Sequence, residues 1–223
     1  MKTILKVLVG SRAYGVYEEN SDYDYRGIFI APTRELLSLK NVHKKAIWTL
    51  EDGKDTTMYE IGHFLFLATK CNPTILEVFK APVVEITQEG KVLRGLFADV
   101  WNTISVYNAF KGYSHNQRTK FLDNKDNRAN KYAIAYTRTL WQLLDLLYLG
   151  DYSVELKSQY QRDIIKKYRA NLYTVGEVIN YAENMIKNIY LFFIGDSDES
   201  QTNKLTNYDK INKFLLKIRK KFW

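Results

Sequence analysis

A Gly-Ser pair followed closely by two alternating aspartates constrains this chain more than any other feature. Gly10 and Ser11 interrupt a β-rich apolar run at residues 4–9, and Asp22 and Asp24 follow after a short loop. Because glycine takes positive φ without steric cost, the pair predicts a tight turn that can pass beneath a phosphate. The chain then returns to a β pattern, so both aspartates enter a strand at positions i and i+2 and project from one face. This predicts a carboxylate pair facing a phosphate cradle.

Nucleotidyl transfer is the chemistry that needs such a pair. The α-phosphorus of a nucleoside triphosphate is open to attack once oxygen ligands hold Mg²⁺ or Mn²⁺ against the phosphates. Two ions about 3.5–4 Å apart then clamp the attacking and leaving oxygens. An isolated Asp-x-Asp sequence is more often part of a solvated strand end. Its combination with the Gly-Ser turn favours a metal and phosphate site.

These residues resemble the DNA polymerase β-type nucleotidyltransferase superfamily. Two motifs carry the resemblance, Gly10-Ser11-Arg12-x-Tyr14-Gly15 and Ser21-Asp22-x-Asp24-x-Arg26-Gly27. Within the superfamily, the chain is similar to predicted nucleotidyltransferases found beside RNA ligases and RNA-repair genes. The similarity covers residues 4–80 and includes Asp55-x-x-x-Tyr59-Glu60, Phe64-Leu65 and Asn72-Pro73-x-x-x-Glu77, with a weaker match at Lys131 and Arg138.

The resemblance implies a metal-dependent transfer of a nucleoside monophosphate to an acceptor hydroxyl. It implies Mg²⁺ or Mn²⁺ as cofactor, an NTP as substrate and an RNA or tRNA end as acceptor. A protein hydroxyl or a small molecule is an alternative acceptor, and a non-catalytic nucleotide- or RNA-binding module is the alternative from another class. The implied catalytic residues and metal ligands are Asp22, Asp24 and Asp55, and the implied nucleotide-binding residues are Gly10, Ser11, Arg12, Lys131 and Arg138.

The third carboxylate also has support from the local pattern. Asp52-Gly53 is a strong two-residue hairpin signal between two strand-like runs, which puts Asp55 near the start of a strand. We expect Asp55 to be the third metal ligand or the base for the acceptor hydroxyl. Glu51 and Asp52 are rivals for this role, although the turn itself explains Asp52.

Each cationic side chain of the predicted site has an alternative role besides phosphate binding. Lys131 and Arg138 are seven positions apart, which places them on one helix face that could line a triphosphate or simply face water. Ser11 is expected to bind a β- or γ-phosphate, and Arg12 to neutralise charge at the mouth of the site. For both Arg12 and Arg26 the alternative is a structural ion pair with Glu18, Glu19 or the aspartates, and for Arg26 we expect this structural role.

Composition excludes several other classes of protein. The chain has 223 residues of which 46% are hydrophobic, enough to bury roughly 70% of its unfolded surface. A single cysteine, Cys71, excludes an internal disulfide and a cysteine-rich zinc site, and we expect it to be a packed thiol. No apolar run is long enough to span a membrane, so we expect a cytoplasmic protein with no membrane partner. The net charge of +8 arises entirely after residue 100, which favours an anionic partner or a well-solvated helical surface.

The periodicity of apolar residues predicts an α+β protein of two domains. Residues 1–90 are expected to form a small mixed-sheet nucleotidyltransferase domain packed on helices, and residues 91–223 an all-helical domain that closes the nucleotide cleft. Proline at position 73 should open a new helix after an earlier one ends. No spacing predicts an oligomeric state. Helices are expected near residues 92–120, 129–149, 158–169, 174–195 and 207–221.

Overall fold

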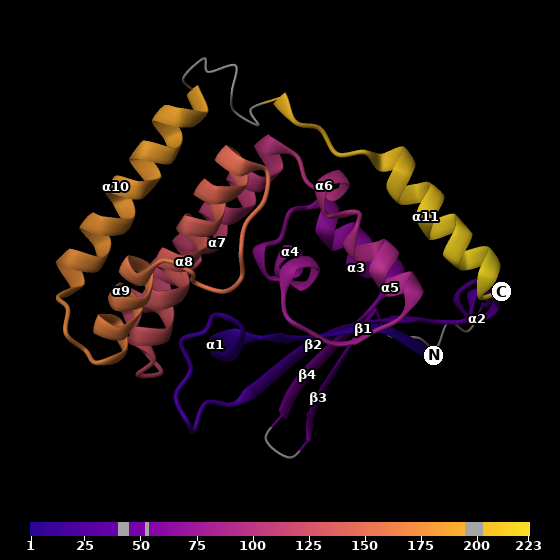
Figure 1. Ribbon diagram of the computed structural model, residues 1–223, viewed down its shortest axis with the longest axis horizontal. Coiled ribbons are helices and arrows are strands. Elements are labelled where there is room, and N and C mark those ends of the chain that lie inside the picture. The colour runs from indigo at the N-terminus through magenta and orange to yellow at the C-terminus, as the bar shows by residue number, and fades with distance from the viewer. Residues whose placement is uncertain (40–44, 52–53, 195–202) are drawn as a thin grey trace. The chain divides into compact units, whose positions relative to one another are not determined.

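The computed structural model describes residues 1–39, 45–51, 54–194 and 203–223 (Figure 1). The chain divides into two compact units. The first unit contains residues 1–101 together with 205–223, and the second contains residues 102–204. This division differs from the expected boundary near residue 90, because both residues 91–101 and the last helix belong with the sheet.

The first unit is built on a five-stranded mixed sheet with strand order β3-β4-β2-β1-β5. β2 and β4 pair in parallel, and the other neighbours are antiparallel. The α+β prediction is therefore confirmed. The predicted hairpin strands pair in register up to Glu51 and Lys54, while its turn residues 52 and 53 lie outside the described part of the chain. The strands are β1 (Lys2–Val9), β2 (Tyr23–Ile30), β3 (Ala46–Glu51), β4 (Lys54–Glu60) and β5 (Val83–Ile86).

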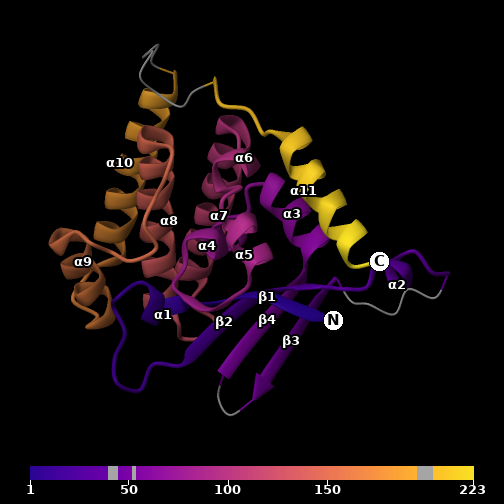
Figure 2. The ribbon, with the colours of Figure 1, turned by 45° about the vertical axis from the view of Figure 1, so that its right-hand side comes forward.

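Three helices pack on one side of this sheet, α3, α4 and α5 (Figures 1 and 2). The break predicted at Asn72-Pro73 is confirmed, because α4 begins at Pro73 and the Asn72 side chain accepts a hydrogen bond from the Thr74 amide. Tilted aromatic contacts connect Phe64, Phe79 and Phe97 through the core. The helices of this unit are α1 (Gly10–Ala13), α2 (Thr33–Leu36), α3 (Ile61–Thr69), α4 (Pro73–Lys80), α5 (Gln88–Arg94), α6 (Phe97–Val100) and α11 (Tyr208–Lys221).

Charged contacts hold α11 in the first unit. Arg219 donates two hydrogen bonds, of 2.7 and 2.9 Å, to the carboxylate of Glu60, which is only 5% exposed. The Thr33 hydroxyl donates to the Arg219 carbonyl oxygen at 2.7 Å. Lys221 donates to Glu89, and that hydrogen bond is the largest of the interactions that lower the pKa of Glu89 to about 2. These partners are far apart in the sequence, so helix periodicity could not assign α11 to the sheet.

The second unit is helical, as expected. Its helices are α7 (Thr103–Asp123), α8 (Ala129–Leu149), α9 (Gln159–Arg169) and α10 (Val175–Ile194). The predicted helices at 129–149, 158–169 and 174–195 match closely. The single helix predicted at 92–120 is wrong, because the chain forms α5, α6 and α7 there. α7 begins after Asn102, whose side chain caps the helix by accepting a hydrogen bond from the Ser105 amide. Within the described residues, no helix is long and apolar enough to cross a membrane.

Candidate active site

The predicted phosphate turn lies at the end of β1. Gly10 has a φ of +73°, a left-handed conformation that favours glycine. A Cβ atom at this position would lie 2.5 Å from Oδ2 of Asp24, too close for any side chain. Two separate requirements therefore select glycine, the backbone angle and the approach of the carboxylate. The turn and the strand are fitted to each other through this contact.

Asp24 and Asp55 are brought together by the sheet. They are direct partners in the parallel pairing of β2 with β4, so their side chains project from the same face of adjacent strands about 4.8 Å apart. Both are partly exposed. Asp55 Oδ1 accepts a 2.8 Å hydrogen bond from the indole nitrogen of Trp48 on β3, which fixes one oxygen of that carboxylate. The face they share also carries Arg26, which reaches α4.

Asp22 lies outside this pair. It precedes the first residue of β2 and is exposed. Among the described residues, no three histidine, cysteine, aspartate or glutamate side chains form a group that could hold a metal ion. The side chain of Glu51 and all of Asp52, the two rivals of Asp55, fall outside the described part. A carboxylate pair still fits Mg²⁺, which is commonly bound by one or two carboxylates with substrate phosphates and water completing its shell.

Arg12 and Arg26 both make structural contacts. Arg12 donates through Nε and Nη2 to the Ser21 carbonyl oxygen, at 3.1 and 2.9 Å, so its guanidinium holds the loop between α1 and β2. Arg26 donates to the Thr74 carbonyl oxygen at 2.7 Å and lies 3.9 Å from Glu77. An ion pair was expected for Arg26, but its partner is Glu77 on α4 rather than Glu18, Glu19 or an aspartate.

The two cations predicted on α8 have different surroundings. Lys131 is exposed near the start of the helix. Arg138 is only 5% exposed and donates a 3.0 Å hydrogen bond to Gln142 within the helical unit. The spacing predicted a common helix face, but burial separates the two side chains.

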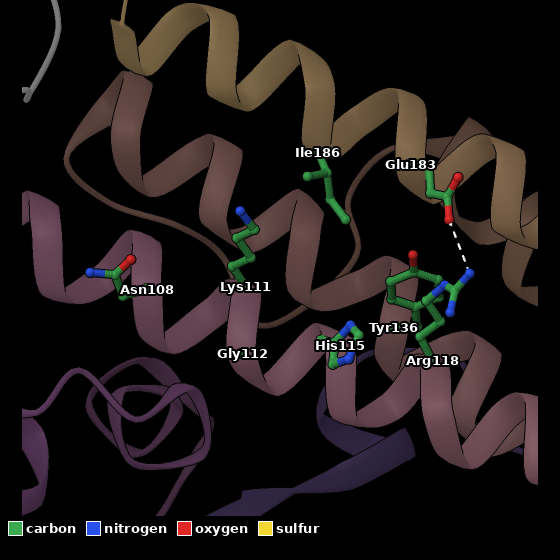
Figure 3. Close-up of a pocket in the computed structure, with 8 residues that line it drawn as sticks. All are labelled: Asn108, Lys111, Gly112, His115, Arg118, Tyr136, Glu183 and Ile186. Atoms are coloured by element: carbon green, nitrogen blue, oxygen red, sulfur yellow. Dashed lines mark hydrogen bonds and ion pairs between the residues drawn. The ribbon is translucent and has the colours of Figure 1, made fainter.

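A pocket of about 520 Å³ lies in the helical unit (Figure 3). Three of its lining residues, Lys111, His115 and Arg118, are spaced i, i+4 and i+7 on α7 and face the same cavity. Arg118 forms a 3.2 Å ion pair with Glu183 of α10. Such a group of side chains can bind a phosphate or another anion in competition with Glu183. The remaining lining residues are Asn108, Gly112, Tyr136 and Ile186.

The Tyr136 hydroxyl is the buried polar group of this pocket. It has no partner with hydrogen-bond geometry among the described residues, although the Arg118 side chain lies beside it (Figure 3). Burial, followed by the charge of Glu183, raises the pKa of this tyrosine, and Arg118 opposes the shift. Sequence reasoning missed the pocket, because cations with the same spacing also occur on α8. Only the packing of α7 against α8 and α10 distinguishes the two sets.

The chain is similar to known proteins in sequence and, more weakly, in backbone. An uncharacterised 38.9 kDa protein from the nrdC-mobD intergenic region of Enterobacteria phage T4 is 28% identical over 170 residues. The alignment covers 73% of this chain and 48% of the phage protein, so the chain spans about half the length of that relative. A nucleotidyltransferase-like protein from Exiguobacterium sibiricum 255-15 aligns over 98% of this chain and 74% of its own, at 12% identity. With a TM-score of 0.33, the two backbones correspond only loosely.

The family comparison is more specific. Residues 1–174 match the model of the RNA repair pathway DNA polymerase beta family. The match includes the Gly10 turn, the Asp24–Asp55 pair and most of the helical unit. The chain therefore belongs to the RNA repair pathway DNA polymerase beta family, a nucleotidyltransferase-like family of the polymerase β type.

Proposed function

We propose that this protein transfers a nucleoside monophosphate from an NTP to a hydroxyl group at an RNA or tRNA end. The observation that carries the proposal is the placement of Asp24 beside Asp55 on adjacent strands, with the Asp24 carboxylate against the Gly10 turn. Acidic ligands and a glycine turn at the ends of the three central strands suit a substrate that is both phosphorylated and bound through cations.

The residues have separate roles in the proposed reaction. Backbone amides of the turn at Gly10 and Ser11 bind the β- and γ-phosphates. The acceptor oxygen attacks the α-phosphorus, the bond to the bridging oxygen of pyrophosphate breaks, and the hydroxyl proton passes to a base. Asp55 is placed for that base role through Oδ2, because Trp48 already engages Oδ1. Asp24 orients the reacting groups from the neighbouring strand.

Asp24 and Asp55 are also the residues that would hold Mg²⁺ or Mn²⁺. Their carboxylate oxygens are the ligand type that both ions prefer. A bound ion would supply Lewis-acid stabilisation of the phosphates and align the attacking and leaving oxygens. Asp22 is a further acid that can join the shell only if the segment before β2 moves inward.

RNA is favoured as the acceptor for two reasons. The matched family is described as part of an RNA repair pathway. The chain also has a net charge of +8, and its positive excess lies after residue 100, which attracts polyanions. Neither the family's place in RNA repair nor the positive charge would be expected for a protein that modifies a protein or a small molecule.

Incubation of the protein with each labelled NTP, Mg²⁺ or Mn²⁺ and total RNA tests the proposal. We expect pyrophosphate release and label on RNA ends. Asp24→Asn and Asp55→Asn should each reduce the rate by about a hundredfold or more, since an amide is a weaker ligand for Mg²⁺ than a carboxylate and cannot act as the base. Asp123→Asn, a half-exposed acid on α7, is the matched control and should leave the rate unchanged.

The outcomes separate the alternatives. Label on a protein or a metabolite would retain the chemistry and replace the acceptor. NTP binding without pyrophosphate release in any acceptor pool would favour the non-catalytic binding module. Full activity in a folded Asp24→Asn, Asp55→Asn double variant would remove this pair from the reaction.

A further inference from the structure

The side of the sheet opposite the carboxylates carries a connected row of aromatic and cationic side chains. Alternation along β2 sends Asp24 and Arg26 toward α4 and sends Tyr23 and Tyr25 to the other side. The two tyrosine rings stack at 6.3 Å between centroids with 17° between their planes. The acids of the candidate site and these rings therefore occupy opposite faces of the same strand.

Two cations extend the row of rings. The Arg12 guanidinium lies 3.8 Å from the centroid of Tyr23 and 4.9 Å from that of Tyr17. At the other end, Lys6 Nζ of β1 lies 4.7 Å from the centroid of Tyr25. We call Tyr17, Arg12, Tyr23, Tyr25 and Lys6 the aromatic strip. Its members come from β1, β2 and the segment that joins them.

The aromatic strip is accessible to a ligand. Tyr17 is 55% exposed and Tyr23 is 43% exposed, and Tyr25 is partly exposed. The described helices α3, α4 and α5 lie on the other side of the sheet (Figure 2). Lys54, the β4 partner of Tyr23, is exposed beside it and adds another positive charge.

We propose that the aromatic strip binds single-stranded RNA, with bases stacking on the parts of the Tyr23 and Tyr25 rings that Arg12 and Lys6 do not cover, and phosphates held by Lys6 and Arg12. Every base offers a π-face to a tyrosine ring, and an open sheet that presents aromatic side chains is a common platform for unpaired bases. The cations suit a polyanion. A duplex keeps its bases stacked on each other, so it cannot use the rings.

The inference rests on the proposed function and adds a surface for the RNA substrate. The two faces of β2 then have different roles, since the acidic face serves nucleotide chemistry and the aromatic face binds the strand. Arg12 has a defined part in it, because its bonds to the Ser21 carbonyl oxygen hold the guanidinium between two rings. The same bonds explain why Arg12 is committed to the loop rather than to the candidate active site.

Fluorescence anisotropy with a labelled oligouridine of about a dozen nucleotides tests the inference without any NTP. The Tyr23→Leu, Tyr25→Leu double variant should raise the Kd about tenfold or more, while the corresponding double Phe variant should stay within about twofold. Tyr208→Leu is the matched control, since Tyr208 is 53% exposed in the same unit but lies on α11. Thermal melting of each variant establishes that it is folded.

The salt dependence of RNA binding tests the contribution of the cations in the aromatic strip. Between about 50 and 200 mM salt, the logarithm of the association constant falls with the logarithm of the salt concentration. Lys6→Gln should make this slope about 0.7 less steep, and exposed Lys217→Gln should not change it. This variant keeps both rings, so it tests the strip even if the leucine variant does not fold. Equal affinity for single-stranded and duplex RNA, no binding of oligouridine, or equal losses in Tyr208→Leu would overturn the inference.

The result is independent of the catalytic test. If labelled NTP is transferred to RNA while the strip variants bind oligouridine like the wild type, the inference alone fails. If Asp24→Asn and Asp55→Asn leave pyrophosphate release intact while the strip variants lose RNA, the assignment of the active site fails and the strip is retained.

Discussion

At the scale of single residues, Gly10 is the position on which the candidate active site most depends. Its left-handed backbone lets β1 turn, and its missing side chain admits the Asp24 carboxylate. Asp24 in turn is the acid that the sheet pairs with Asp55. One glycine therefore links the phosphate turn to the carboxylates.

Gly10→Ala should disturb that link. We expect a loss of about 1–3 kcal/mol in the free energy of unfolding and at least a tenfold loss of nucleotidyl transfer, since the new methyl group must displace Asp24. Chemical denaturation and pyrophosphate release measure the two effects. Gly176→Ala is the control, because a Cβ there meets nothing within 4 Å, and it should stabilise the protein slightly. Unchanged activity in Gly10→Ala would show that the turn does not position Asp24.

At the scale of secondary-structure elements, α11 depends on charged contacts as well as apolar ones. Ile211, Phe214 and Ile218 bury its inner face, while Arg219 and Lys221 anchor its last turn. The carboxylate of Glu89 has a folded pKa of about 2, below its usual value of 4.5. Its contribution to stability is thus present above about pH 4.5 and is lost as the pH falls toward 2.

Lys221→Gln should reveal this contribution. At pH 7 we expect the variant to be about 1 kcal/mol less stable than the wild type, since the Lys221 side chain is 60% exposed and water partly screens its charge. The difference should shrink as the pH is lowered from 4.5 to 2, because the wild type then protonates Glu89. Urea denaturation at several pH values makes the comparison, with exposed Lys220→Gln as control. A difference that stayed constant over this range would contradict the assignment to Glu89.

The elements of the candidate site were predictable where the signal was local. The Gly10 turn, the strand that carries Asp24 and the strand that begins near Asp55 all follow from short-range periodicity and turn residues. The packing of Arg138 and the anchoring of Arg219 were not predictable, because burial and ion pairs depend on which helices meet. Arg219 and Glu60 are 159 positions apart. The cations facing the pocket on α7 have the spacing of those on α8, and only packing separates them.

At the scale of the whole molecule, each unit has its own core. Cys71 is fully buried in the first unit, and it is the single cysteine of the chain. Trp141 is buried in the second unit, where its indole nitrogen donates to the Tyr181 hydroxyl at 3.0 Å. Burial is the largest of the influences that raise the pKa of Tyr181 to about 12. Cys71 can therefore report on the unfolding of the first unit, and Trp141 on that of the second.

Thiol labelling in increasing urea should follow the opening of the first unit alone. We expect Cys71 to react slowly in the native protein, and Arg219→Leu to shift its labelling to lower urea by breaking the pair with Glu60. Trp141 fluorescence can be followed in a protein whose other tryptophans are replaced by phenylalanine. The urea concentration at its transition midpoint should not change when Arg219→Leu is added. Parallel shifts of both probes would indicate that the two units unfold as one.

The helical unit begins and ends at neighbouring points of the backbone. The Thr103 amide donates to the Lys204 carbonyl oxygen at 3.2 Å, and the Asn207 amide donates to the Asp99 carbonyl oxygen at 2.9 Å. The helical unit is thus an insertion in the sheet unit, and the two ends of the insertion lie close together. A short linker could join residues 101 and 205 without stretching the backbone. The insertion therefore lies between α6 and α11, and the strands that bear the acids are connected to one another without passing through it.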